Sequence, residues 1–201
     1  SDNASNDETL DELKKFASSR INFRFIRNYH SIPVSKAINN AIKNAFGNYF
    51  VVLNEVQSVS QNWLDVIIDN LKNTKSVVSL PKLFPDSGLV HSTGIKIEIS
   101  NEKLNFLYQN QNEDYETLVN SVGRVFPDAL SVNCIAFSSE LIEETGLFDE
   151  SFESFLFEID FSLRAKEFGY SPICITDSIV IIKDFLEINM PTEAEITLFT
   201  Q

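Results

Sequence analysis

The sequence predicts an α/β fold in which helices cover both faces of a doubly wound sheet. Two runs of strand length, the wholly apolar Tyr49–Leu53 and the mostly apolar Ser76–Leu80, lie on either side of a stretch with helical periodicity. The apolar stripe of that stretch recurs every three or four residues, at Trp63, Leu64, Ile67, Ile68 and Leu71. Right-handed strand–helix–strand units place their helices on the two faces of a sheet. A chain of 201 residues, 43% of them hydrophobic, is large enough to bury such a core.

The first quarter of the chain supplies two helices and two strands. Asn6 or Asp7 caps a helix that runs to Ser18, with acids in its first turn and lysines near its end. Apolar and polar residues alternate over Ile21–Arg27, which predicts a strand with one buried face. A helix follows over Val34–Phe46 and ends at Gly47 as its C-terminal cap. The Tyr49–Leu53 run is then expected to be a central parallel strand, buried on both faces.

The remainder alternates turns, strands and helices in a less regular order. A turn at Pro85–Gly88 precedes two strands that we expect to form a small antiparallel sheet. The predicted elements are strands at Ile95–Ile99, Leu104–Tyr108 and Val132–Phe137, helices at Ser138–Thr145 and Glu158–Phe168, and one or two strands within Ser171–Ile182. We expect Glu187–Gln201 to be a tail, since it shows no core pattern.

The charge distribution argues against one class of partner and favours another. A net charge of -13 is incompatible with a general nucleic-acid surface. The stretch from Leu13 to Asn54 nevertheless contains no acidic residue and seven of the 16 basic ones. Such a locally positive region suits a compact anionic ligand such as a diphosphate. The alternative is that these lysines and arginines lie on solvated helix and strand faces.

The two cysteines and the hydropathy profile bear on the compartment. Cys134 and Cys174 lie in apolar, strand-like runs without a neighbouring His or Cys, which predicts buried, reduced thiols and a cytoplasmic protein. We expect no transmembrane segment, because no run approaches the roughly 18 apolar residues required. The N-terminus lacks signal-peptide features and an initiator Met, so we expect part of the protein to lie upstream.

Seven short motifs occur in the order found in one enzyme family. Their sequence resembles that of the family 2 inverting glycosyltransferases of the GT-A type, especially the bacterial rhamnosyltransferase-like branch that builds surface polysaccharides. The motifs are Ser1–Asp7, Arg27–Asn28 with Ala37–Ile42, Gly47–Asn54, Pro85–Gly94, Asn133–Phe137, Thr145–Phe152, and Phe157–Arg164 with Gly169–Tyr170.

The resemblance implies one GT-A-type domain over residues 1–185, followed by the tail at 186–201. Residues 1–84 correspond to part of the nucleotide-sugar-binding half of a mostly parallel, Rossmann-like sheet. Residues 85–185 correspond to the acceptor-side half with its small antiparallel sheet. The first strand and helix of the family are missing, which leaves a sheet edge uncovered and open to pairing with a second copy.

The implied activity is transfer of a sugar from a nucleotide-sugar donor to a glycan or lipid-linked saccharide, in the cytoplasm or at the inner face of the membrane. The resemblance assigns the general base to Glu158. It assigns Asp160 to the acceptor side. In a helix these two residues lie about 200° apart, so only one faces a cleft. An acid pair that merely favours the helix dipole is the alternative.

Further site residues follow from the same resemblance. The donor is expected to contact Asp2, Asn39, Asn54 and Glu55, and the acceptor or sugar to contact Asp86, His91 and Asn133. A turn aspartate and a surface histidine are the alternatives for Asp86 and His91. Four phenylalanines are candidates for lining an acceptor groove, namely Phe148, Phe152, Phe155 and Phe157, whereas Trp63 is expected in the core.

The metal site of the family is altered here. Its Asp-x-Asp motif, which holds Mg²⁺ or Mn²⁺ through hard carboxylate oxygens, reads Asn54-Glu55-Val56. A further position that is often His is Ile182. Asn54 and Glu55 are the remaining ligand candidates, so metal binding is not favoured. Lys36 or Arg27 is then a candidate for the charge that stabilises the leaving diphosphate.

Two functions of different kinds therefore stand beside each other. The retained carboxylate of Glu158 favours an active enzyme, although we expect these 201 residues alone to show little turnover. The altered metal motif and the missing first strand favour a degenerate domain that binds a glycan or a partner without catalysis. An unrelated α/β binding protein is the third possibility.

Overall fold

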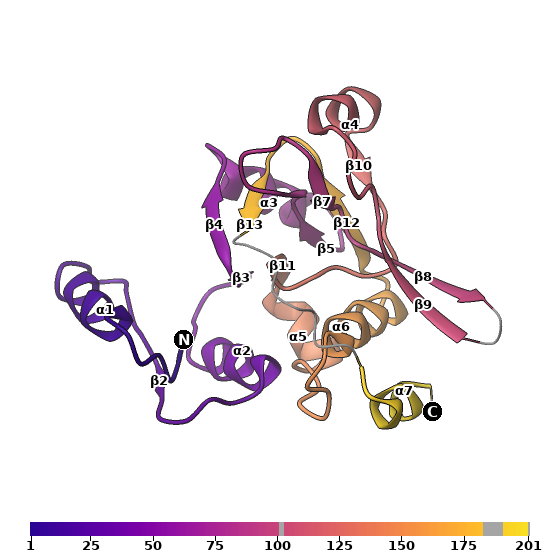
Figure 1. Ribbon diagram of the computed structural model, residues 1–201. Helices are drawn as coiled ribbons and strands as arrows, with labels where there is room; N and C mark the ends of the chain where they lie inside the picture. Colours follow the sequence, from indigo (N-terminus) through magenta and orange to yellow (C-terminus); the bar gives the residue numbers. More distant parts are fainter. Residues whose placement is uncertain (101–102, 183–190, 201) are drawn as a thin grey trace.

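The computed structural model describes residues 1–100, 103–182 and 191–200 (Figure 1). Twenty helices and strands follow one another in those ranges. In chain order they are β1 (Asp2–Asn3), α1 (Thr9–Ser18), β2 (Arg27–Asn28), α2 (Val34–Lys43), β3 (Tyr49–Leu53), β4 (Val56–Val59), α3 (Trp63–Asn73), β5 (Ser76–Ser79), β6 (Lys82–Leu83), β7 (Val90–Ser92), β8 (Ile95–Ser100), β9 (Lys103–Tyr108), α4 (Tyr115–Ser121), β10 (Arg124–Val125), β11 (Cys134–Ser138), α5 (Ser139–Thr145), α6 (Leu156–Glu167), β12 (Ser171–Ile175), β13 (Val180–Ile182) and α7 (Glu193–Phe199).

The central sheet has five strands in the order β10-β12-β5-β11-β3. β5 and β12 pair in parallel, while β11 lies antiparallel between β5 and β3. β3 and β5 therefore run in the same direction, as the α/β prediction requires, but they are separated by a reversed strand. The predicted α/β class is confirmed, with a mixture of parallel and antiparallel pairing.

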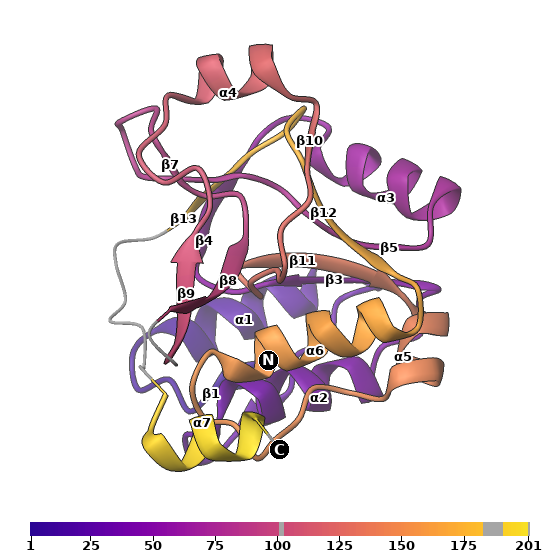
Figure 2. The same ribbon diagram turned by 90° about the vertical axis from the view of Figure 1, so that its right-hand side faces the viewer.

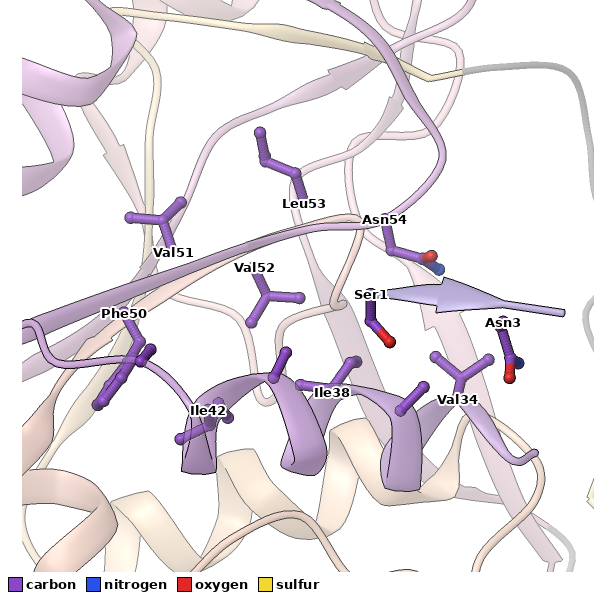
Figure 3. A pocket seen from close by; sticks show the side chains of 13 residues that line it. Ser1, Asn3, Val34, Ile38, Ile42, Phe50, Val51, Val52, Leu53 and Asn54 are labelled. Atoms are coloured by element: carbon purple, nitrogen blue, oxygen red, sulfur yellow. The ribbon is translucent and has the colours of Figure 1, made fainter. Parts of the chain in front are cut away.

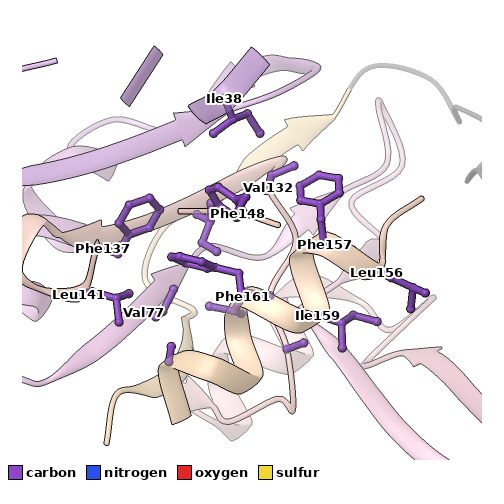
Figure 4. Packing of buried hydrophobic residues seen from close by; sticks show 14 of the residues in the cluster. Ile38, Val77, Val132, Phe137, Leu141, Phe148, Leu156, Phe157, Ile159 and Phe161 are labelled. Atoms are coloured by element: carbon purple, nitrogen blue, oxygen red, sulfur yellow. The ribbon is translucent and has the colours of Figure 1, made fainter. Parts of the chain in front are cut away.

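Helices cover both faces of this sheet (Figure 2). Each face has its own apolar core. α3 packs on one face, where Ile67 and Leu71 meet Val78 and Ala136. On the other face α2, α5 and α6 surround a phenylalanine cluster (Figure 4). Within it the rings of Phe148 and Phe161 are stacked at 4.3 Å between centroids. Alternating residues of β11 face opposite cores, which explains why its first four residues, 134–137, are all buried.

A second sheet stands at the carboxyl end of the central strands. Its order is β4-β13-β6-β7, with β13 parallel to β6 and antiparallel to β4. The hairpin of β8 and β9 projects beside it over six residue pairs. The β8–β9 hairpin corresponds to the small antiparallel sheet that the sequence predicts after Pro85.

The N-terminal segment forms a separate two-stranded parallel sheet of β1 and β2 (Figure 1). The prediction of a strand over Ile21–Arg27 is wrong for most of that range, since only Arg27–Asn28 pairs, and Ile21 is fully exposed. Alternation buries a strand face only if another layer lies against it, and the described residues supply none at Ile21. β3 is likewise an edge strand, half-buried, rather than a central one buried on both faces.

Two further predictions need correction. The helix expected to reach Phe46 ends at Lys43, and Gly47 does not cap it, because Asn44 takes that place. Residues 193–200 of the expected tail contain α7, which begins with a capping box of Thr192 and Glu195. α7 packs through Phe199 against Phe152. Residues 186–190 of the tail lie outside the described residues.

Candidate active site

The carboxyl end of β3 meets the start of β11 at one rim of the central sheet. The N–H of Asn54 donates to the carbonyl of Asn133 at 3.2 Å, and the Asn133 amide returns a bond to the carbonyl of Asn54 at 3.0 Å. The Ser131 hydroxyl donates to Oδ1 of Asn133 at 2.9 Å. Ser131 and the backbone of Val132 also act on the Glu158 carboxyl, and both lower its pKa. Asn54 and Glu158, far apart in the chain, are therefore joined through two intervening side chains.

Helix α6, which carries Glu158, is held against the segment at residues 130–132. Ser162, one turn further along α6, accepts the N–H of Leu130 at 3.0 Å, and its hydroxyl donates to the carbonyl of Glu158 at 2.9 Å. Ser162 and Glu158 are four residues apart and so lie on one helix face. The segment at residues 130–132 is thus attached to two successive turns of the helix. The Glu158 carboxyl has little freedom to move away from the rim.

Burial changes the protonation of Glu158. Its side chain is almost fully buried, and this desolvation raises the pKa of the carboxyl from 4.5 to about 7. The positive charge of Lys82 and the hydrogen bonds of Ser131 and Val132 act in the opposite direction, while the negative charge of Glu55 adds to the rise. A carboxyl that titrates near neutral pH can accept a proton more readily than an ordinary glutamate.

The residues behind Glu158 are mostly neutral near pH 7. Burial, and then the charge of Lys82, lower the pKa of His91 to about 4. Burial and the charge of Glu158 raise the pKa of Tyr108 to about 12. The two rings lie 4.7 Å apart between centroids. Lys82 is almost fully buried, and burial is the main cause that lowers its pKa.

The turn after β3 does not supply the donors that a divalent ion requires. Glu55 has a left-handed backbone with φ of 59°, an uncommon conformation for a residue with a side chain. No group of three or more His, Cys, Asp or Glu in the described part of the chain is arranged to hold a metal ion. Val56 has no ligand atom. Within the described residues, the Asp-x-Asp position therefore offers one carboxylate, that of Glu55, and no complete Mg²⁺ or Mn²⁺ site.

An apolar cavity of about 330 Å³ lies beside the rim (Figure 3). α2 forms its floor with Val34, Ile38 and Ile42, and β3 forms one wall. Ser1, just before β1, and Asn3 of β1 also line it, and Ser1 lies near Asn54 at the end of β3. In the described residues no strand pairs with the outer edge of β3.

The predicted donor residues are dispersed. Asp2 is buried on the other side of β1 from the cavity, where it accepts the N–H of Ser5 and lies 3.8 Å from Arg27. Asn39 is buried, and its amide is bonded to Phe148 and Glu150. It therefore connects α2 to the loop before α6 and has little capacity left for a ligand. Among the cations proposed for the diphosphate, Arg27 is held by Asp2 and by the carbonyl of Ser5.

Lys36, the other cation proposed for the diphosphate, is exposed on α2 and forms no ion pair within the part of the chain that the structure describes.

The predicted acceptor residues are dispersed as well: some lie at the rim and others lie away from it. Asn133 lies in the rim, and His91 is buried behind it rather than at the surface. Asp86 is exposed in a turn. Asp160 faces away from Glu158 and binds Arg164, whose guanidinium also reaches the carbonyls of Thr145 and Leu147. It anchors a loop.

The phenylalanines expected to line a groove belong to the core instead. Phe148, Phe152 and Phe157 are buried, and Phe155 is half-buried and packs against the same cluster. Trp63 packs against the other core, as expected. Both cysteines are buried and free, as predicted.

Sequence reasoning missed Ser131 and Lys82. Neither residue has a local signal: a serine before a strand and a lysine after Pro81 are ordinary surface residues by composition. Only the folded chain brings them close enough to influence the pKa of Glu158.

The layered sheet with its rim of polar strand ends has the architecture of the GT-A glycosyltransferases. Two solved structures show it: GalNAc-T7 with UDP, GalNAc and Mn²⁺ (TM-score 0.66, 16% identity), and the mannosyltransferase PcManGT from Pyrobaculum calidifontis with GDP-Man and Mn²⁺ (TM-score 0.62, 17% identity). They cover 92% and 98% of this chain, which in turn spans only 37% and 48% of theirs. The family model for glycosyl transferase family 2 matches residues 1–128, and the chain belongs to that family. No curated protein matches the sequence significantly.

Proposed function

We propose that this chain is the catalytic part of a glycosyltransferase that moves a sugar from a nucleotide-sugar donor to a hydroxyl of a glycan or lipid-linked saccharide. The observation that carries the proposal is the Glu158 carboxyl, fixed at the rim and titrating near neutral pH. In its ionised form it takes the proton of the acceptor hydroxyl as that oxygen attacks the anomeric carbon. The bond from that carbon to the diphosphate breaks, and a single displacement of this kind inverts the anomeric configuration.

Two features of the rim support this assignment of Glu158. The Asn54–Asn133–Ser131 chain of hydrogen bonds leads from the end of β3, where ligands of open α/β sheets bind, to Ser131, which acts on the Glu158 carboxyl. Asp160, the other candidate base, is engaged by Arg164 at 2.6 Å. The cavity between β1 and β3 offers room on the donor side, and Asn54 is part of its lining.

A second function is favoured by one specific observation. The described residues contain no acidic cluster for a metal, although both structural neighbours were solved with Mn²⁺. A GT-A domain that binds a nucleotide or a glycan without transferring the sugar would need no such cluster. The rhamnosyltransferase-like branch, a bacterial source, a role in surface polysaccharides and a cytoplasmic location remain predictions. No described helix is long and apolar enough to cross a membrane.

One experiment separates the two functions. Hydrolysis-coupled release of UDP, GDP or dTDP from nucleotide sugars is measured for the intact protein and for its Glu158→Gln and Asp160→Asn variants, with and without Mn²⁺. We expect Glu158→Gln to reduce turnover at least 100-fold, in line with the loss of a general base, and Asp160→Asn to retain most of it. Equal turnover in the Glu158→Gln variant would refute the base assignment. Nucleotide binding without turnover in any of the proteins would favour the binding domain.

A further inference from the structure

A serine in the middle of α6 forms a hydrogen bond that the helix itself does not require. Ser162 is fully buried and lies one turn after Glu158. Serine is less favourable than alanine inside a helix, because its hydroxyl competes with the backbone for hydrogen bonds. Here the hydroxyl donates to the carbonyl of Glu158 at 2.9 Å and accepts the N–H of Leu130 at 3.0 Å. Ser162 therefore joins the turn that carries the candidate base to a segment outside the helix.

That segment, at residues 128–133, lies between the β8–β9 hairpin and the rim of the central sheet. At its start the N–H groups of residues 128 and 129 donate to the carbonyl of Ile95 at 2.9 and 3.1 Å. At its end Asn133 is hydrogen-bonded to the residue that follows β3. The bond from the buried Leu130 to Ser162 lies between these two attachments. The segment is thus fixed at both ends and connected to α6 in between.

Loss of the Ser162 hydroxyl would take the acceptor away from the Leu130 N–H. A buried N–H without an acceptor is costly, so the segment would shift until this donor reached water or another acceptor. The shift would also move the next two residues, Ser131 and Val132, which act on the Glu158 carboxyl. A displacement of about 1 Å at a reacting group can lower a rate about 100-fold.

We propose that Ser162 is a positioning residue for sugar transfer: its hydroxyl sets the distance between the turn of α6 that carries Glu158 and the segment that leads to the rim. This rests on the proposed function for the role of Glu158 as the base, whereas the two hydrogen bonds belong to the folded chain. A serine that only stabilised α6 would need no more than the bond to the carbonyl of its own helix. The positioning depends on the second bond, across to Leu130.

The second bond is tested without turnover. Hydrogen exchange of the Leu130 amide is measured by NMR in the intact protein and in four variants, namely Ser162→Ala, Ser162→Cys, Ser162→Thr and Ser35→Ala. Cysteine is close to serine in size but is a weak acceptor, and threonine keeps the hydroxyl. Ser35 is the matched control, because it is fully buried in α2 and its hydroxyl donates to the carbonyl of Phe152 at 3.5 Å.

We expect the Leu130 amide to exchange about fivefold faster or more in Ser162→Ala and Ser162→Cys, in line with the loss of one hydrogen bond. In Ser162→Thr and Ser35→Ala its exchange should stay within about twofold of wild type. Equal exchange in all five proteins would overturn the proposal. If Ser162→Ala does not fold, Ser162→Cys decides the comparison.

The same proteins are then assayed for sugar transfer. We expect kcat to fall roughly 10- to 100-fold in Ser162→Ala and Ser162→Cys while KM for the donor stays within about twofold, and Ser162→Thr to restore most of the rate. Ser35→Ala should behave as wild type. Faster exchange with an unchanged kcat would show that the bond is only structural and would refute the positioning role. If Glu158→Gln keeps its turnover, the base assignment fails, while the exchange result still reports the bond.

Discussion

Replacing Glu158 with Gln should remove a pH dependence from the stability of this chain. The folded-state pKa of Glu158, about 7, lies above the ordinary 4.5. The stabilisation from the protonated carboxyl is therefore fully present below pH 4.5 and is lost as the pH rises through about 7. A difference of roughly 2.5 units, at about 1.36 kcal/mol each, corresponds to about 3 kcal/mol. Glutamine keeps the shape and an acceptor oxygen but never ionises.

The assay is urea unfolding of wild type and Glu158→Gln at pH 4.5, 6 and 8. We expect equal free energies of unfolding at pH 4.5 and a variant more stable by about 3 kcal/mol at pH 8, or roughly 6–12 °C in Tm. Glu167→Gln is the matched control, because Glu167 is an exposed glutamate of the same helix. A difference between variant and wild type that stays constant from pH 4.5 to 8 would show that burial does not disfavour the charge of Glu158.

Two further predictions concern the contacts that hold α6 and α7. Arg164→Met should lower the free energy of unfolding by about 2–4 kcal/mol, because the guanidinium bonds to Asp160 and to two backbone carbonyls; a loss under about 1 kcal/mol in urea unfolding would contradict this. Glu195→Gln should release α7 at neutral pH, seen by NMR as loss of the contact between Phe199 and Phe152. Burial alone would raise the pKa of Glu195, but hydrogen bonds from backbone N–H groups, Thr192 first, lower it to about 2. In wild type the contact is thus present above pH 4.5 and lost as the pH falls towards 2, and its survival in Glu195→Gln would refute a role for the carboxylate.

Much of the fold could be predicted because its helices and strands leave local patterns in the sequence. The apolar run Ser76–Leu80 and the stripe from Trp63 to Leu71 describe β5 and α3 closely, since a buried strand and an amphipathic helix leave periodic traces. The same reasoning failed for Ile21–Arg27 and for the central position of Tyr49–Leu53. Periodicity states which face is apolar, but it contains no information on which layer covers that face. The helix α7 was detectable through the capping pair Thr192 and Glu195, a signal that was overlooked.

For the candidate site too, local motifs could be read from the sequence, whereas tertiary contacts could not. The sequence by itself determined the family and the α/β class, and it supplied Glu158 as the candidate base, because these depend on motifs of a few consecutive residues. It also determined that the Asp-x-Asp ligands are absent, since Val56 has no atom to offer a metal. The tertiary structure alone decided that Asn39 and Asp160 are engaged structurally, and that Ser131 and Lys82 influence the pKa of Glu158. The protonation of a buried carboxyl depends on the charges and dipoles within a few ångströms, and those come from β6, β11 and α6, segments that only the folded chain brings together.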